Sequence, residues 1–149
     1  MKISTRGQYG LRAMLDLGLY GKDEPVALKS IAERQGISEA YLEQLIASLR
    51  KAGLVISVRG ASGGYYLSRA PSEISVGEIL RVLEGPIAPV ECVSEDINEN
   101  ECRNSGHCAT RVLWRRLRDS IIEVLDSTSL ADLIEIANDL NCSQEMYYI

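Results

Sequence analysis

The sequence lacks most of the patterns on which enzyme active sites and membrane-spanning helices depend. Its 149 residues include a single histidine, and they contain no GxxxxGK phosphate-binding loop and no paired-carboxylate pattern. One histidine leaves little for acid–base or nucleophilic triads, so we expect no enzymatic activity. No apolar run approaches the roughly 18 residues of a transmembrane helix, and the opening MKISTRGQYGLRAM has no signal-peptide core. These absences predict a cytoplasmic protein with no membrane partner.

Cysteine is scarce, but three of the four cysteines lie close together. Cys92, Cys102 and Cys108 share an acidic segment with the only histidine, His107, and residues 86–108 show no helical periodicity. A chain of this length can bury a core without disulfides, and clustered cysteines in a reducing cytosol favour metal binding or redox sensing. We therefore expect a long loop that is functional or disordered. The residues alone leave four alternatives open: an iron–sulfur site, a zinc site, a redox disulfide and a chance cluster of free thiols.

The net charge of −5 conceals two halves of opposite sign. Residues 1–70 carry ten Lys or Arg against six Asp or Glu, whereas residues 71–149 carry six against fifteen. Only the N-terminal half has the positive balance of a surface that meets phosphate. The two halves are therefore predicted to face different partners.

Helical periodicity in the first third of the chain predicts three helices. Serine or threonine stands where a helix start is expected, and glycine where a helix end is expected. The expected bounds are Ser4 or Thr5 to Gly21, Leu28 to Gln35, and Ser38 to Gly53. In the third helix the apolar positions form an inward stripe, namely Leu42, Leu45, Ile46 and Leu49. Two helices joined by a glycine-containing turn outline a helix-turn-helix.

A glycine-rich turn between two short strands follows these helices. Residues 54–58 are mostly β-branched, residues 59–64 read RGASGG, and residues 65–67 form a second strand. This is the pattern of a wing. The fold is therefore predicted to be mainly α with a small β-wing, an α+β winged helix-turn-helix with a DNA partner.

The C-terminal half is predicted to add three further helices. One is expected from Val76 to Leu83, a long one from Ala109 to Leu125, and a last one over the apolar positions from Leu130 to Ala137. The long helix exceeds what the fold around it needs, so we expect it to pair with its twin in a homodimer. The predicted division is a DNA-binding domain over 1–84, a cysteine loop over 85–108, and dimerisation and C-terminal helices over 109–149.

Several segments together resemble one family of regulators: MKISTRGQYGLRAMLDL, SIAERQGISEAYLEQLIASLRKAGLV, SVRGASGGYYL, SVGEILRVLEGPIAPVE and LWRRLRD. They are similar to the bacterial winged-helix transcription regulators that include IscR, NsrR and CymR. The N-terminal half, GPIAPVE and the ending MYYI look most like CymR, whereas the cysteine triad looks like IscR or NsrR. The resemblance implies a dimeric repressor that binds a double-stranded DNA operator and controls cluster-assembly or cysteine and sulfur metabolism genes.

The resemblance also implies an iron–sulfur cluster on Cys92, Cys102 and Cys108, with [2Fe–2S] favoured over [4Fe–4S]. The spacing departs from the family, because nine residues fill the first gap and five the second where the gaps are usually equal. The fourth ligand does not carry over, since Arg111 stands where IscR has a histidine and Gln8 where NsrR has an acidic residue. His107 is the candidate fourth ligand, although its side chain diverges from that of Cys108. Cys142 is interpreted as a packed or idle thiol.

Two other functions remain open within the family. One is a CymR-type repressor that takes its signal from a cysteine-synthase partner without a cluster, and the other is an NsrR-type nitric-oxide sensor.

The predicted DNA contacts lie on the third helix and the wing. Gln44 suits adenine, Glu43 can accept from cytosine N4, and Arg59 is placed for the minor groove. Gly60, Gly63 and Gly64 are expected to let the backbone approach the DNA closely. The remaining candidates for base or phosphate contacts are Ser38, Ala40, Tyr41, Arg50 and Lys51, with Tyr9 and Arg12 from the first helix.

Overall fold

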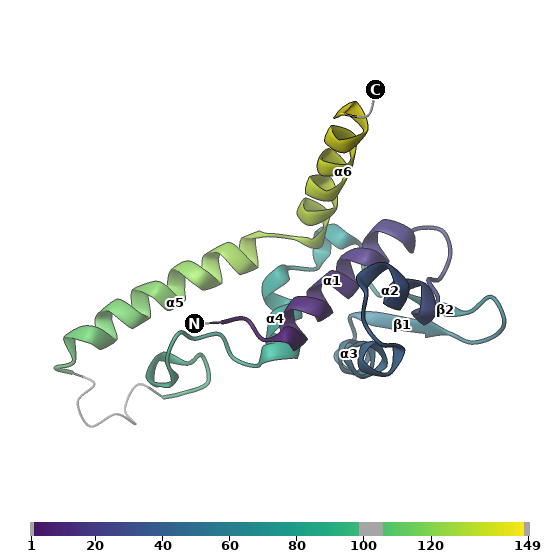
Figure 1. Cartoon of the computed structure of the whole chain (residues 1–149). Coiled ribbons are helices and arrows are strands. Elements are labelled where there is room, and N and C mark those ends of the chain that lie inside the picture. The colour runs from purple at the N-terminus through teal and green to yellow at the C-terminus, as the bar shows by residue number, and fades with distance from the viewer. Residues whose placement is uncertain (1, 99–105, 148–149) are drawn as a thin grey trace.

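The computed structural model describes residues 2–98 and 106–147. This part of the chain contains six α-helices, a two-stranded antiparallel sheet and two short 3-10 turns (Figure 1). The N-terminal elements are α1 (Thr5–Tyr20), α2 (Leu28–Gln35), α3 (Glu39–Lys51), β1 (Val55–Val58) and β2 (Gly64–Leu67). They are followed by η1 (Pro71–Glu73), α4 (Val76–Glu84), η2 (Glu91–Val93), α5 (Ala109–Ser127) and α6 (Leu130–Tyr147). The predicted α+β class is confirmed.

Serine side chains cap the N-terminal ends of three helices, and the sequence predicted two of these caps. The side chains of Ser4, Ser38 and Ser75 accept hydrogen bonds from backbone N–H groups in the first turns of α1, α3 and α4. Each satisfies a donor that would otherwise have no partner in the helix. The C-terminal end of α2 is capped differently. Gly36 takes the left-handed conformation with φ 66°, in which a residue with a Cβ would be strained, and the helix ends there.

The core of the N-terminal domain is built around α1, which packs against α2, α3, α4, β2 and α6. The predicted inward stripe of α3 is buried in this core, together with Met14 and Leu17 from α1 and Ile79 from α4. Gly10 lies where α1 meets α4, and a Cβ there would lie 2.2 Å from a methyl carbon of Leu83, so the Leu83 side chain would have to move. The core thus fixes the position of α3, whose outer face remains open.

The two strands pair in the register Val55 with Leu67 and Val58 with Gly64, and the wing extends beyond them. An additional bridge between Val26 and Tyr65 ties β2 to the turn after α1. The wing is therefore held at its base by both the sheet and the helical core.

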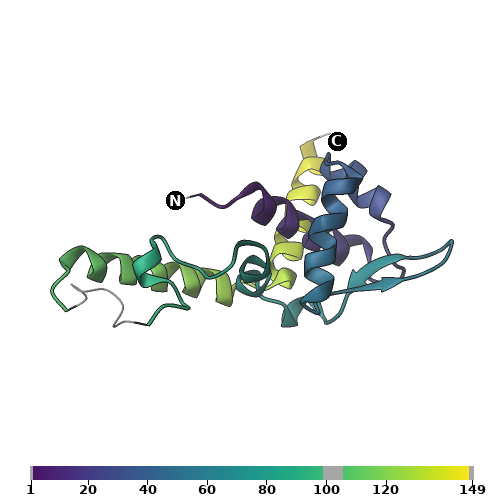
Figure 2. The same cartoon turned by 90° about the horizontal axis from the view of Figure 1, so that it is seen from below.

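The C-terminal helices leave the core in different directions. In Figures 1 and 2, α5 extends away from the N-terminal domain as an arm, whereas α6 contacts α1 and, in Figure 1, rises away from the domain toward the C-terminus. The last helix runs to Tyr147 rather than ending near Ala137 as expected, and residues 138–147 contain no glycine or proline that would stop it. Among the described residues, no helix is both long and apolar enough to cross a membrane.

Candidate nucleic-acid interface and cysteine loop

The outer face of α3 is open along its whole length. Figure 2 shows α3 at the front of the domain with the wing projecting beside it. Tyr41 of α3 and Tyr9 of α1 are half-buried, whereas the other predicted contacts on and beside α3 are exposed: Ser38, Ala40, Glu43, Gln44, Arg50 and Lys51. This surface is one helix wide, and it carries side-chain types that can hydrogen-bond to base edges and phosphates.

Tyr41 is oriented by neighbours on α1. Its ring meets that of Tyr9 edge-on, with ring centroids 6.3 Å apart and planes at 88°, and the Arg12 guanidinium lies 4.9 Å from the centre of the Tyr9 ring. Arg12 also donates hydrogen bonds to the side chain and the backbone carbonyl of Gln35, at the end of α2. Arg12 therefore joins α1 to α2 within the protein, in addition to its predicted role as a phosphate contact.

Arg6 joins three helices beneath this surface, a role that the sequence did not reveal. Its guanidinium donates to Ser48 Oγ of α3 at 2.6 Å and to the Leu83 carbonyl of α4 at 3.1 Å. Arginine in the first turn of a helix is disfavoured by the helix dipole, and this was the one available indication of a special role. The contact fixes the back of α3 against the other helices.

A buried carboxylate fastens the two helices that precede α3. Asp16 is 1% exposed and receives hydrogen bonds of 2.7 and 2.9 Å from Arg34 and one of 3.0 Å from Gln35. The Arg34 guanidinium lies 4.0 Å from the centre of the Tyr20 ring, and the hydrogen bonds that it donates to Asp16 raise the pKa of Arg34 above its usual value. In the sequence, the only indication of this pair is an acidic residue between two leucines.

Backbone geometry within the protein already requires glycine at two positions of the wing. A Cβ at Gly64 would lie 2.4 Å from the Val26 carbonyl oxygen, so glycine is required where β2 passes the turn after α1. Gly60 has φ 113° with open space around it, so its glycine requirement is conformational. Close approach to DNA remains a prediction for these glycines, and Arg59 is exposed beside them.

The structure places two of the three clustered cysteines. Cys92 lies in η2, and Cys108 is the N-cap residue of α5; both are free thiols of intermediate exposure. His107 is exposed in the turn before Cys108, and Cys142 is exposed on α6. Cys102 lies outside the described residues. Within the described ranges, no three His, Cys, Asp or Glu side chains come close enough to hold a metal ion.

The start of α5 favours an anionic sulfur. The pKa of Cys108 is lowered, first by the Thr110 hydroxyl 3.3 Å from the sulfur and then by the backbone N–H of Arg111. A place at a helix start, beside Arg111, acts on the Cys108 pKa in the same direction. Arg111 is itself 7% exposed, and its buried Nε has no hydrogen-bond partner in the described part of the chain. A buried cation with an unsatisfied donor, close in sequence to a thiol of lowered pKa, is suited to an additional anionic group.

Ionic contacts tie the cysteine loop to both flanking helices. Arg81 of α4 pairs with Glu95 of the loop at 2.8 Å and with Asp126 near the end of α5 at 2.6 Å. Glu95 also accepts a 2.9 Å hydrogen bond from the Ile87 N–H, and Arg118 of α5 donates to the Val93 carbonyl at 3.1 Å. We call Arg81, Glu95 and Asp126 the loop anchor. The Arg81 guanidinium lowers the pKa of Glu95, and both carboxylates raise the pKa of Arg81.

An exposed recognition-type helix, a wing beside it and a projecting helical arm define a winged helix-turn-helix transcription regulator. Comparison with known proteins gives the family, because residues 3–136 match the Rrf2 model, described as an iron-dependent transcriptional regulator. The chain belongs to the Rrf2 family.

Two members show how far the similarity extends. CymR of Bacillus subtilis is 49% identical over 147 residues, which cover 99% of this chain and 97% of CymR. The solved structure of that global cysteine regulator matches with a TM-score of 0.76, covering 91% of this chain and 98% of the other. The structure of T. potens IscR matches with a TM-score of 0.75 and 51% identity, covering 92% and 88%. Since the relatives are named as regulators, the chain is a DNA-binding transcriptional regulator.

Proposed function

We propose that this chain is a dimeric operator-binding repressor whose DNA affinity depends on an iron–sulfur cluster held by Cys92, Cys102 and Cys108. The observation that carries the proposal is the start of α5, where the pKa of Cys108 is lowered and the buried Nε of Arg111 has no described partner. Thiolates are the ligands that such clusters require, and a cationic neighbour stabilises the anionic group they form. When bound, the cluster would supply a centre sensitive to redox state and iron supply.

The places of the described ligand candidates around α5 support this choice of residues. Cys92 lies in η2, which packs against α5, and Cys108 begins α5, so two thiols flank the same helix. His107 stays the candidate fourth ligand, because it is exposed in the turn that precedes Cys108. Ligation by these cysteines would add a second restraint to the loop that the loop anchor already holds at Glu95.

Dimerisation is supported by the apolar face of α5. Leu113, Leu117 and Val124 repeat at steps of four and seven residues, so they share one face of the helix, and they are 53%, 37% and 63% exposed. Apolar residues arranged in this way on a projecting helix mark a protein interface. We call these three residues the α5 stripe, and a second copy of the chain is the proposed occupant.

A CymR-type function without a cluster is the alternative. It is favoured by the 49% identity to CymR over nearly the whole length of both chains. The end of α6 stands away from the body, and Met146 is 78% exposed, which would leave this end accessible to a cysteine-synthase partner.

Anaerobic purification separates the two functions. A brown protein with stoichiometric iron and sulfide supports the cluster, whereas a colourless, iron-free protein that binds cysteine synthase supports the alternative. Zinc in place of iron would contradict both the iron–sulfur cluster and a response to redox state or iron supply.

Operator titration tests the regulatory part of the proposal. Cluster-loaded, apo and C92A/C102A/C108A proteins are compared without oxygen at one salt concentration, because salt alone changes DNA affinity. We expect loaded and apo forms to differ by about 5- to 150-fold, the usual range of allosteric coupling. The triple variant should remain a folded dimer and bind like the apo form. Equal affinities of loaded and apo protein for every operator would contradict a DNA switch in this loop.

A further inference from the structure

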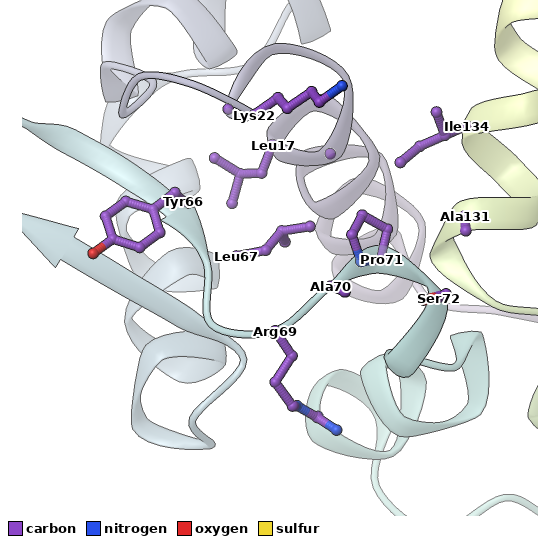
Figure 3. A pocket seen from close by; sticks show the side chains of 12 residues that line it. Leu17, Lys22, Tyr66, Leu67, Arg69, Ala70, Pro71, Ser72, Ala131 and Ile134 are labelled. Atoms are coloured by element: carbon purple, nitrogen blue, oxygen red, sulfur yellow. The ribbon is translucent and has the colours of Figure 1, made fainter.

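A cavity of about 510 Å³ lies between the N-terminal domain and the first part of α6, away from both α3 and the cysteine loop. Figure 3 shows Leu17, Leu67 and Pro71 toward its middle, with Ala131 and Ile134 of α6 on the opposite side. Most of the lining is aliphatic, as in sites that take small molecules, and the volume falls in the range of such sites.

The walls of this cavity are held in place without a ligand. The bridge between Val26 and Tyr65 fixes β2, and a second bridge between Ser75 and Ser129 fixes the start of α6 beside η1. The Leu130 N–H also donates to the Ile74 carbonyl at 2.8 Å. A pre-formed cavity requires little reorganisation when it is filled, which favours binding.

Two cations border the cavity, but only one is available to a ligand. Arg69 is paired with Glu78 and donates to the Glu73 carbonyl, and Figure 3 shows its guanidinium directed away from the centre. Lys22 extends along one edge of the cavity, and its ammonium has no ion pair or hydrogen bond within the described ranges. The Tyr66 hydroxyl also points away in this view. The cavity therefore offers an aliphatic interior with a single positive charge at its edge.

We propose that this cavity binds a small monocarboxylate with an apolar body, the carboxylate pairing with Lys22 and the body contacting Leu17, Leu67 and Ile134. Such a ligand would touch both β2, which carries the wing, and α6. The site is separate from the cysteine cluster, so it stands or fails independently of the proposed cluster.

The test is a titration of the full-length protein with octanoate, followed by NMR of isotope-labelled leucine and isoleucine methyl groups. We expect saturable shifts at Leu17, Leu67 and Ile134. K22M should weaken octanoate binding by a measurable factor of up to about fivefold, the usual cost of losing an exposed ion pair, whereas the matched control K29M on α2 should bind normally. Octylamine, which has the opposite charge, should bind more weakly than octanoate.

A second variant fills the cavity from the α6 side. A131F should abolish the shifts at Leu17 and Leu67 while its dispersed spectrum reports an intact fold. The proposal is overturned if octanoate gives no saturable shift in the millimolar range, if shifts are confined to the α5 stripe, or if K22M binds as tightly as the parent protein. If an acetylated peptide with a free C-terminal leucine binds more tightly than octanoate, the small-acid proposal is also wrong, and the occupant is the C-terminal end of a polypeptide.

Discussion

At the scale of single residues, the predicted DNA surface combines acidic and basic side chains with different expected roles. Glu43 and Arg59 are both exposed, one on α3 and the other at the wing. A carboxylate repels phosphate, so Glu43 can contribute only through a specific base contact, whereas a wing arginine attracts any duplex. We predict that E43A relaxes discrimination at one base pair by roughly 1–3 kcal/mol, while R59A weakens binding to all sequences.

Binding of a randomised operator library measures both effects in one experiment. E39A is the matched control for Glu43, because Glu39 is an exposed glutamate on the same helix. It should leave the preferred sequence unchanged. A uniform change across all sequences in E43A would argue against base reading by Glu43.

At the scale of elements, the loop anchor connects α4, the cysteine loop and α5 through charged side chains that are only partly exposed. Removing the Glu95 charge should loosen the loop at Ile87, whose N–H donates to this carboxylate. We predict that E95Q increases hydrogen exchange of the Ile87 amide at neutral pH. The loss of global stability should be at most about 1 kcal/mol, because partly exposed ion pairs are screened by water.

The pH dependence of the same contact has a definite sign. Arg81 lowers the pKa of Glu95 below the ordinary 4.5, so its contribution is complete above 4.5 and is lost as pH falls through the lowered value. The amide shift of Ile87 should follow this titration in the parent protein and not in E95Q. E91Q, at an exposed position in η2, is the control. An unchanged Ile87 titration in E95Q would show that Glu95 does not hold the loop.

At the scale of the whole molecule, the proposed dimer would cover the exposed α5 stripe with a second copy of the chain. We predict that L117E converts the dimer to monomers, raising the dissociation constant by at least about a hundredfold, because an unpaired carboxylate in an apolar interface costs several kcal/mol. Sedimentation velocity measures the change. I56E, at an exposed position on β1, is the control and should stay dimeric. A dimeric L117E protein of normal stability would place the interface elsewhere.

Local patterns explain why the sequence predicted so much of the fold. The caps at Ser4 and Ser38 and the left-handed Gly36 are determined within a few residues, and the apolar stripe of α3 repeats at the helical period. The wing follows from a glycine-rich turn between a β-branched strand and a tyrosine-containing strand. The length of α6 was underestimated, because its exposed second half lacks the periodic apolar pattern on which the prediction relied.

The features of the site that the sequence could predict are those that depend on residues nearby in the chain. The lowered pKa of Cys108 follows in direction from its place at a helix start, and the exposed face of α3 follows from its buried stripe. Arg6 and Asp16 could not be assigned, because their partners lie 77 and 18 residues away in the chain.

By itself, the sequence determined the order of elements, the inward and outward faces of α3 and the grouping of cysteines before α5, since each depends on spacing along the chain. Only the tertiary structure decided which charges meet and which surfaces enclose a cavity. Arg81 finds Glu95 and Asp126, and Lys22 borders a cavity completed by α6, because packing brings distant segments together. Hydrogen bonds and ion pairs act over a few ångströms in space, whatever the separation in sequence.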